Sequence, residues 1–228
     1  MDIFDTGPVV PGGPALLPDK DARLDGRSVR IRPVAAARDA AALFAATHGE
    51  DSDPGQWTYM SYGPFADEAA MQQWLEEIQA SSDPLFMVVR DAGSDAPLGV
   101  VSYLNIEPTH RTIELGNIWY VPGARRTAVN TETIYLLLKD CFERLGYRRV
   151  EWKCDNLNER SKSAAIRLGF RFEGVFRQHF IVKGRNRDTA WFAVVDKDWE
   201  VLKANFEQVL YDAECTVSLR ELNEKIHE

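Results

Sequence analysis

The run at residues 125–132, which reads Arg-Arg-Thr-Ala-Val-Asn-Thr-Glu, has the features of an anion-binding turn that opens a helix. The first turn of a helix leaves backbone N–H groups without partners and carries the positive end of the helix dipole, and both favour a bound pyrophosphate. Arg125 and Arg126 add positive charge for the phosphates. An ordinary capped helix with two surface arginines is the alternative interpretation.

Asn158 and Ser161 stand at the head of a second helical stretch, residues 159–168. Asparagine is a preferred N-cap residue, so capping alone accounts for Asn158. A serine hydroxyl at a helix N-terminus can also donate a proton to a developing anion. Ser161 is therefore a candidate general acid, and an ordinary place in the capping turn is its alternative.

Two residues on predicted strands could accept a proton. Glu114 lies on the strand predicted at residues 112–121, and His179 lies on the strand predicted at residues 171–182. The unperturbed pKa of histidine suits a base near neutral pH. A solvated strand carboxylate and a packed strand histidine are the alternatives, and a water chain with no side-chain base is the third.

The loop at residues 57–65 is rich in aromatic side chains. Exposed aromatic residues on a loop favour recognition, and their faces can hold a cationic amine. We expect Trp57 and Tyr59 to contact a substrate. The alternative is that these side chains pack against the first helices.

Composition limits the class of protein. With 27 Lys and Arg against 35 Asp and Glu, the net charge of -8 disfavours a nucleic-acid partner, because phosphate binding needs clustered basic residues. Cys141, Cys154 and Cys215 show no pairing pattern, which predicts reduced thiols in a cytoplasmic protein. No signal peptide and no apolar run of about 20 residues is visible, so we expect a soluble protein without a membrane partner.

The hydrophobic periodicity predicts one α/β domain with a mixed sheet. Strands are expected at residues 28–32, 85–90, 98–106, 112–121, 149–154, 171–182 and 188–195, with a hairpin turn at 183–187. Helices are expected at residues 35–46, 68–80, 130–145, 159–168, 198–210 and 217–226. The strands between 85 and 121 form an antiparallel meander, and the strand-helix-strand crossover from 112 to 154 implies parallel pairing.

The two ends of the chain fall outside this pattern. Residues 1–27 combine prolines and glycines and read as an irregular arm. The predicted division is therefore an arm at 1–27, a domain at 28–200 and a helical extension at 201–228.

The order of elements, together with local motifs, resembles the Gcn5-related N-acetyltransferase (GNAT) superfamily over about residues 27–200. The turn at 125–132 is similar to the family pattern Gln/Arg-x-x-Gly-x-Gly/Ala followed by Thr-Glu, although Ala128 and Asn130 occupy the glycine positions. The run at 167–174 is similar to the Leu-Gly-Phe…Glu-Gly signature, and Asp188 follows the hairpin turn as in this superfamily. The motifs look most like the branch of the ribosomal-protein N-terminal acetyltransferases.

The resemblance implies roles for residues of this chain. Asn158 would contact the pantetheine arm of acetyl-CoA, Ser161 would protonate the departing thiolate, and Glu114 would be the general base. The implied cofactor-binding set is Val121, Arg125, Arg126, Thr127, Ala128, Val129, Asn130, Thr131 and Asn158. No metal is expected.

The resemblance thus implies a cytoplasmic N-acetyltransferase, monomeric or homodimeric, that acts on a small-molecule or peptide amine. An enzyme that uses another acyl-CoA, such as succinyl-CoA, is one alternative. A non-catalytic module that binds CoA or a partner is the other, because a fold does not fix function.

Overall fold

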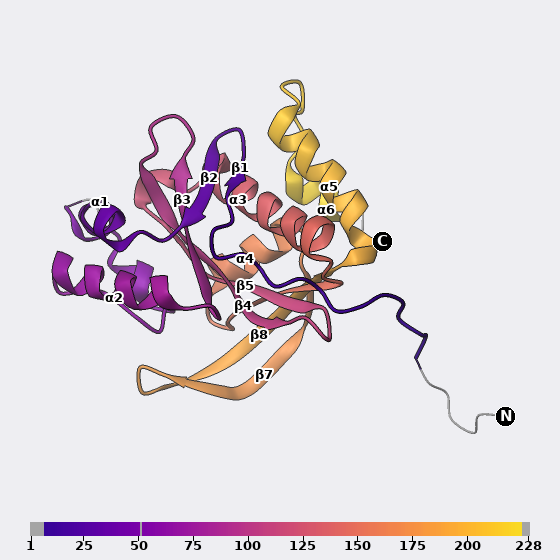
Figure 1. Ribbon diagram of the computed structural model, residues 1–228, viewed down its shortest axis with the longest axis horizontal. Helices are drawn as coiled ribbons and strands as arrows, with labels where there is room; N and C mark the ends of the chain where they lie inside the picture. Colours follow the sequence, from indigo (N-terminus) through magenta and orange to yellow (C-terminus); the bar gives the residue numbers. More distant parts are fainter. Residues whose placement is uncertain (1–6, 51, 225–228) are drawn as a thin grey trace.

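A single eight-stranded mixed sheet with helices on both faces forms the body of the protein (Figure 1). The structure, a computed structural model, describes residues 7–50 and 52–224. The strand order is β1-β2-β3-β4-β5-β6-β8-β7. Every neighbouring pair is antiparallel except β5–β6, which is parallel. This topology confirms the predicted α/β fold with an antiparallel meander and a parallel crossover.

The elements follow the predicted order closely. The strands are β1 (Leu24–Asp25), β2 (Val29–Pro33), β3 (Leu85–Asp91), β4 (Pro97–Glu107), β5 (Thr112–Tyr120), β6 (Arg149–Asp155), β7 (Arg171–Val182) and β8 (Arg185–Val195). The α-helices are α1 (Ala36–His48), α2 (Glu68–Ala80), α3 (Ala128–Lys139), α4 (Glu159–Arg167), α5 (Asp196–Tyr211) and α6 (Leu219–Glu224). Short 3-10 turns occur at η1 (Pro54–Trp57) and η2 (Pro122–Ala124), and η3 (Asp140–Leu145) is a π-helical turn.

The helices form two separate layers. The helices α1 and α2 pack against each other and contact β4 and β3, whereas α3 contacts β1 and β2, α4 contacts β6 and β7, and α5 contacts β8. Figure 1 shows α1 and α2 on one side of the sheet and α3, α5 and α6 on the other. The core between these layers includes Leu43, Leu75, Leu137 and Phe206, all fully buried.

Some boundaries differ from the predictions. The expected helix at 130–145 begins at Ala128 and becomes π-helical at Asp140. The hairpin turn consists of Lys183 and Gly184 alone, both with positive φ, because a two-residue turn of this hand matches strand twist. The last helix begins at Leu219, and residues 225–226 of its predicted span lie outside the described residues.

Steric crowding explains why a glycine follows α4. Gly169 has φ +88°, and a Cβ at this position would lie 2.2 Å from Cδ2 of Leu202 in α5. Only glycine combines the left-handed backbone with this close approach. Gly169 therefore follows directly on the predicted end of this helix at residue 168.

The described part of the N-terminal arm is attached to the body at separate points. The backbone N–H of Ala15 donates to the carbonyl of Pro108 at 3.0 Å, and that of Leu16 donates to the carbonyl of Leu145 at 2.8 Å. The strand β1, which the sequence pattern did not predict, adds to the sheet beside β2. The division at residues 27 and 200 stays a prediction. Within residues 7–50 and 52–224, no helix is long and apolar enough to cross a bilayer.

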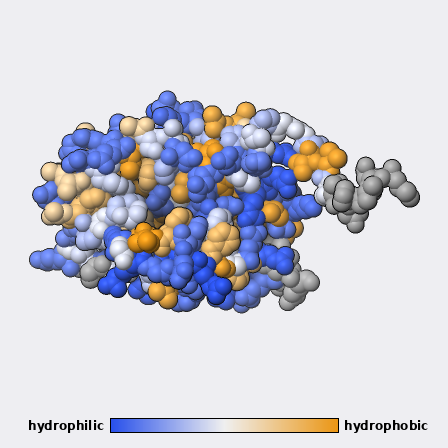
Figure 2. All heavy atoms as spheres, turned by 90° about the horizontal axis from the view of Figure 1, so that it is seen from below, coloured by the Kyte–Doolittle hydropathy of each residue, from blue (hydrophilic) through white to orange (hydrophobic). Residues whose placement is uncertain are grey.

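The outer hairpin carries apolar side chains on its exposed surface. Phe172, Phe176, Phe180 and Ile181 of β7 are all exposed. Figure 2, which views the molecule from below Figure 1, shows apolar residues scattered among hydrophilic ones on this face.

Glu132 connects α3 to the beginning of the sheet. Only 1% of this residue is exposed. It accepts hydrogen bonds from the backbone N–H groups of Arg27 (2.6 Å), Ser28 (2.7 Å) and Val29 (3.1 Å), from the Ser28 hydroxyl, and from the Tyr211 hydroxyl (3.0 Å). Burial opposes ionisation, but the bonds from Ser28, Arg27 and Tyr211 outweigh it and hold the pKa of Glu132 below its ordinary value.

Glu132→Gln is expected to lower the free energy of unfolding by about 2–3 kcal/mol near pH 7, because it weakens hydrogen bonds to a buried charge. Since the folded pKa is depressed, the stabilisation is present above the unfolded pKa of about 4.3 and is lost as the pH falls through the folded pKa. Urea unfolding of both proteins at about pH 7 and about pH 3 measures the difference. If Glu132→Gln lowers the free energy of unfolding equally at both pH values, the stabilisation does not come from the ionised carboxylate of Glu132.

Candidate active site

The parallel pairing of β5 and β6 stops after three rungs. The ladder joins Thr112 to Arg149, Ile113 to Val150 and Glu114 to Glu151. Beyond it, residues 115–120 of β5 and 152–155 of β6 have no ladder with each other in the described chain. We call this opening the β5–β6 gap. The facing edges of these two segments therefore lack ladder partners, although the carbonyls of Gly116 and Tyr120 accept from Ser102 Oγ and Arg125 Nε.

A β-bulge explains why β5 leaves its neighbour. The pairing with β4 shifts between Ser102↔Gly116 and Val100↔Trp119, so an additional residue is inserted in β5. Asn117 lies in this bulge with φ 52°, and its Nδ2 donates to Ser102 Oγ at 2.9 Å. Bulges bend a strand and are common next to active sites.

Glu114 lies at the last rung, beside the gap. It is 5% exposed. Asn105 Nδ2 donates to its Oε2 at 2.6 Å, and Lys153 Nζ lies 2.8 Å from the same oxygen. The other carboxylate oxygen, Oε1, lies near Gly116. A Cβ added to Gly116 would be 3.7 Å from this oxygen. Burial raises the pKa of Glu114 above its ordinary value, while Lys153 and Asn105 oppose the shift.

Ser161 lies in the first turn of α4. Trp152 Nε1 donates to Ser161 Oγ at 3.0 Å, which leaves the hydroxyl proton available for another acceptor. The Ser161 backbone N–H donates to Asn158 Oδ1 at 3.1 Å, so Asn158 is the N-cap of α4. The capping interpretation of Asn158 is therefore confirmed, and its contact with a pantetheine arm stays a prediction.

Glu114 and Ser161 lie on opposite faces of the sheet. Lys153 and Trp152 are neighbours on β6, and successive side chains of a strand point to opposite faces. Lys153 contacts Glu114 on one face, and Trp152 contacts Ser161 on the other. A reacting group held in the gap could therefore meet the carboxylate from one side and the hydroxyl from the other.

The turn before α3 differs in detail from the expectation. The left-handed residue is Arg126, with φ 60°, whereas Ala128 and Asn130 already lie in the helix. Thr127 is the N-cap, and its Oγ1 accepts from the Val129 N–H at 3.2 Å. Neither residue at the glycine positions of the family pattern therefore supplies a left-handed backbone.

The remaining predicted cofactor residues surround this helix start. Val121, which lies between β5 and η2, is buried. Thr131 Oγ1 accepts a hydrogen bond from Arg167 Nη1 at 2.8 Å. Asn130 Oδ1 is buried without a hydrogen-bond partner among the described residues. Such an atom is typically satisfied by a ligand or water.

Arg125 is engaged within the protein. Its Nη1 lies 2.6 Å from Asp53 Oδ2, and its Nη2 donates to Gln56. Arg160, in the first turn of α4, contacts the same Asp53 oxygen at 3.3 Å. The side chain of Arg125 thus binds an internal carboxylate, whereas Arg126 is exposed.

Residues 52–63, which we call the strap, run across the end of the gap. Asp53 binds Arg125 just beyond β5, while the Tyr59 hydroxyl donates to the carbonyl of Leu157 just beyond β6 at 3.0 Å. From the hairpin tip, Lys183 Nζ donates to the carbonyls of Trp57 (3.0 Å) and Gly63 (2.8 Å).

The expectation that Trp57 is exposed was wrong. Its side chain is 3% exposed and packs against the rings of His48, Phe65 and Trp119. The rings of Trp57, Tyr62 and Phe65 pack against one another in a small aromatic core, as the alternative interpretation held. Tyr59 is partly exposed and keeps a place at the edge of the gap.

His179 is not in contact with Glu114. The centroid of its ring lies 3.8 Å from that of Phe180, in a tilted arrangement, and 6.0 Å from that of Trp191. Burial, followed by the charges of Lys153 and Arg187, lowers the pKa of His179. The histidine thus matches the packed-strand interpretation.

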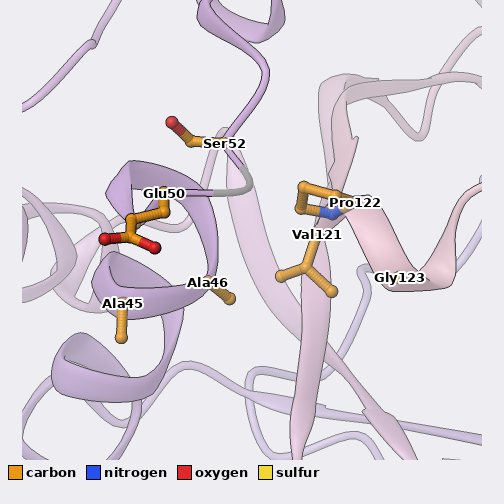
Figure 3. Close-up of a pocket in the computed structure, with 8 residues that line it drawn as sticks. Ala45, Ala46, Glu50, Ser52, Val121, Pro122 and Gly123 are labelled. Carbon is orange, nitrogen blue, oxygen red and sulfur yellow. The ribbon is translucent and has the colours of Figure 1, made fainter.

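A pocket of about 240 Å³ adjoins the turn that leads to α3. Ala45, Ala46, Gly49, Glu50, Ser52, Val121, Pro122 and Gly123 line it. Figure 3 shows Val121 and Pro122 facing the C-terminal end of α1 across this pocket.

Sequence reasoning missed the partners of the carboxylate. Asn105 and Lys153 come from the two strands that flank β5. A signal for Lys153 was present, because Arg149, Glu151, Lys153 and Asp155 alternate with buried residues along β6. Charges on alternate positions indicate one polar face of a strand.

The chain is similar in sequence and fold to known proteins. The family model described as acetyltransferase (GNAT) domain matches residues 28–171. The crystal structure of a GCN5-related N-acetyltransferase from Brucella melitensis is 38% identical, with a TM-score of 0.88, and covers 93% of this chain and 98% of that one. A structure from Chromobacterium violaceum ATCC 12472, assigned to the GNAT family of acetyltransferases, is 41% identical, with a TM-score of 0.79, and covers 88% and 99%.

Curated relatives point in the same direction. YdaF of Bacillus subtilis (strain 168), provisionally named a ribosomal N-acetyltransferase, is 23% identical over 147 residues, which are 64% of this chain and 80% of YdaF. The ribosomal-protein-serine acetyltransferase of Escherichia coli (strain K12) is 29% identical over 94 residues, which are 41% of this chain and 50% of that enzyme. The chain therefore belongs to the GNAT acetyltransferase family, and its relatives include ribosomal-protein acetyltransferases.

Proposed function

We propose that this protein is an N-acetyltransferase that transfers an acetyl group from acetyl-CoA to a primary amine, either a protein N-terminus or an amine on a small molecule. The observation that carries this proposal is that Glu114 and Ser161 lie on opposite faces of the sheet beside the β5–β6 gap. Membership of the GNAT family, whose proteins use acetyl-CoA, supports the choice of acyl donor.

The two residues divide the proton transfers of a direct attack. Glu114 Oε1, which faces Gly116, takes the proton of the amine as the N–C bond forms. As the C–S bond breaks, the Ser161 hydroxyl gives its proton to the departing thiolate. Solvent then returns a proton to Ser161 and accepts one from Glu114, so the charges balance.

The start of α3 suits the phosphates of the donor. Its first turn offers the N–H groups of Ala128 and Asn130 together with the positive end of the helix dipole, while the Val129 N–H is bound by the Thr127 cap. The exposed guanidinium of Arg126 forms no ion pair within the described chain and adds charge at this end.

Arg126→Ala is expected to weaken acetyl-CoA binding by about tenfold, the scale of one lost charge-assisted hydrogen bond. Isothermal titration measures the affinity, and Arg126→Lys, which keeps the charge, is the matched control. The double replacement of Arg125 and Arg126 should weaken binding only slightly more, because Asp53 already holds Arg125. Affinity unchanged in the double variant would remove the pyrophosphate assignment.

The acceptor enters, in this proposal, from the face that carries Glu114. Tyr59 lies at the edge of the gap and is the residue of the strap that we assign to substrate contact. Trp57 supports the strap from beneath and acts on the acceptor only indirectly.

Steady-state release of free thiol from acetyl-CoA, measured with a panel of amines, tests the activity. The panel includes peptides with free N-termini, amino acids, polyamines and amino sugars. We expect amine-dependent release with acetyl-CoA that exceeds release with succinyl-CoA. Saturable acetyl-CoA binding without amine-dependent release from any member of the panel would favour a CoA-binding module instead.

A further inference from the structure

Three side chains surround the ammonium group of Lys153. Its Nζ is 2.8 Å from Glu114 Oε2 and 3.2 Å from Glu151 Oε2. The same atom lies 3.8 Å from the centroid of the Trp191 ring, the geometry of a close cation–π contact. Only 12% of the side chain is exposed. A long, flexible lysine is thus fixed against the carboxylate at the last rung of the β5–β6 ladder.

The contacts of Glu114 are not shared equally between its oxygens. Both Asn105 Nδ2 and Lys153 Nζ contact Oε2. Oε1, near Gly116, has no hydrogen-bond donor among the described residues. A carboxylate that is held through one oxygen leaves the other, which lies on the side of Gly116, without a donor and able to accept a proton.

We propose that Lys153 is a positioning residue that keeps Glu114 ionised and holds it through Oε2, so that Oε1 remains the proton acceptor. The catalytic part of this inference rests on the proposed function. The effect of Lys153 on the pKa of Glu114 does not depend on it. It adds Lys153, with Trp191 and Glu151 as its supports, to the residues on which the reaction depends.

The charged groups around Glu114 determine whether its pKa is raised or lowered. The strand β4 contributes the neutral Asn105, and β6 contributes Lys153 and Glu151. Glu151 is also bound by Arg149 at 2.9 Å, and Arg149 is bound in turn by Glu173 of β7. His179 of β7 lies near Lys153, and burial, followed by the charges of Lys153 and Arg187, lowers the pKa of His179. Lys153 is therefore the cation that acts most directly on Glu114.

The two neighbours of Glu114 on β6 should act in opposite directions. In Lys153→Met, burial is no longer opposed by a cation, and the pKa of Glu114 should rise further. In Glu151→Gln, a like charge is removed and Lys153 no longer divides its contacts, so the pKa of Glu114 should fall. Lys153→Arg keeps the charge and should leave the pKa closer to that of the wild type.

The first experiment is a carbon-detected NMR titration of the Glu114 side-chain carboxyl in the full chain, assigned by comparison with Glu114→Gln. It needs no turnover, so it can succeed even if the amine acceptor is wrong. We expect the midpoint to move up in Lys153→Met and down in Glu151→Gln. Midpoints that stay unchanged in both variants overturn the proposal, and the Glu151 variant decides the matter if Lys153→Met does not fold.

The second experiment measures kcat/KM against pH with acetyl-CoA and the best amine. In Lys153→Met, kcat/KM near pH 6 should fall by about tenfold, whereas the value near pH 9 should approach that of the wild type. Lys153→Arg should restore most of the activity near pH 6. A loss of equal size at every pH would indicate damage to the fold and overturn the positioning role. A wild type that shows no amine-dependent turnover would refute the proposed function and leave the NMR result standing.

Discussion

Replacing Glu114 by glutamine is expected to lower kcat/KM by about 10²- to 10⁴-fold, the scale for loss of a general base, with little change in acetyl-CoA affinity. Glutamine keeps the size of the side chain and can still accept from Asn105, but it cannot take a proton. Because burial raises the pKa of Glu114, the wild-type kcat/KM should decline with acid at a pH above the ordinary range of a glutamate.

The comparison with two other residues makes this result specific. Glu173→Gln, which changes a carboxylate of β7 bound by Arg149, is the matched control and should keep most of the activity. His179→Gln should also remain active, because His179 is packed among aromatic rings. Full activity of Glu114→Gln between about pH 6 and pH 9 would return the choice to His179 or to a water chain.

Ser161→Ala is expected to lower kcat by about 10²-fold, again with little change in acetyl-CoA affinity. The hydroxyl already accepts from Trp152 Nε1, so its proton is the one that can be donated. Ser163→Ala, an exposed serine on the same helix, is the matched control and should have no effect on kcat.

A change of acyl donor separates acid catalysis from a structural role of Ser161. An acetyl thioester whose thiol has a low pKa needs little help from an acid as the thiolate departs. The defect of Ser161→Ala should therefore shrink with such a donor. A defect of the same size with both donors would mean that Ser161 serves the capping turn of α4 and no more.

The order of elements could be read from the sequence because each element has a local pattern. Apolar residues recur at helical spacing in α2 and α3, and Gly169 marks the end of α4 by its backbone requirement alone. The parallel pair also followed from local facts, since a strand-helix-strand crossover dictates it.

The details of the site depend on residues that are distant in sequence. Arg125 meets an aspartate 72 positions earlier, and no local pattern indicates that contact. Aromatic density at 57–65 does not distinguish a small core from a binding surface, so the exposure of Trp57 was predicted wrongly. The sequence does contain a signal for the bulge at Asn117, because Gly116-Asn117 within a strand is a typical sign of irregular backbone.

The β5–β6 gap also bears on the tendency of the protein to aggregate. A strand edge without a partner is a template for pairing with another chain, and natural proteins cover or shorten such edges. Here the unpaired edges, at 115–120 and 152–155, lie inside the sheet, and the strap joins the segments beyond them through Arg125 and Leu157. A foreign strand would have to break these contacts before it could add to either edge. An opening enclosed in this way disfavours β-strand addition.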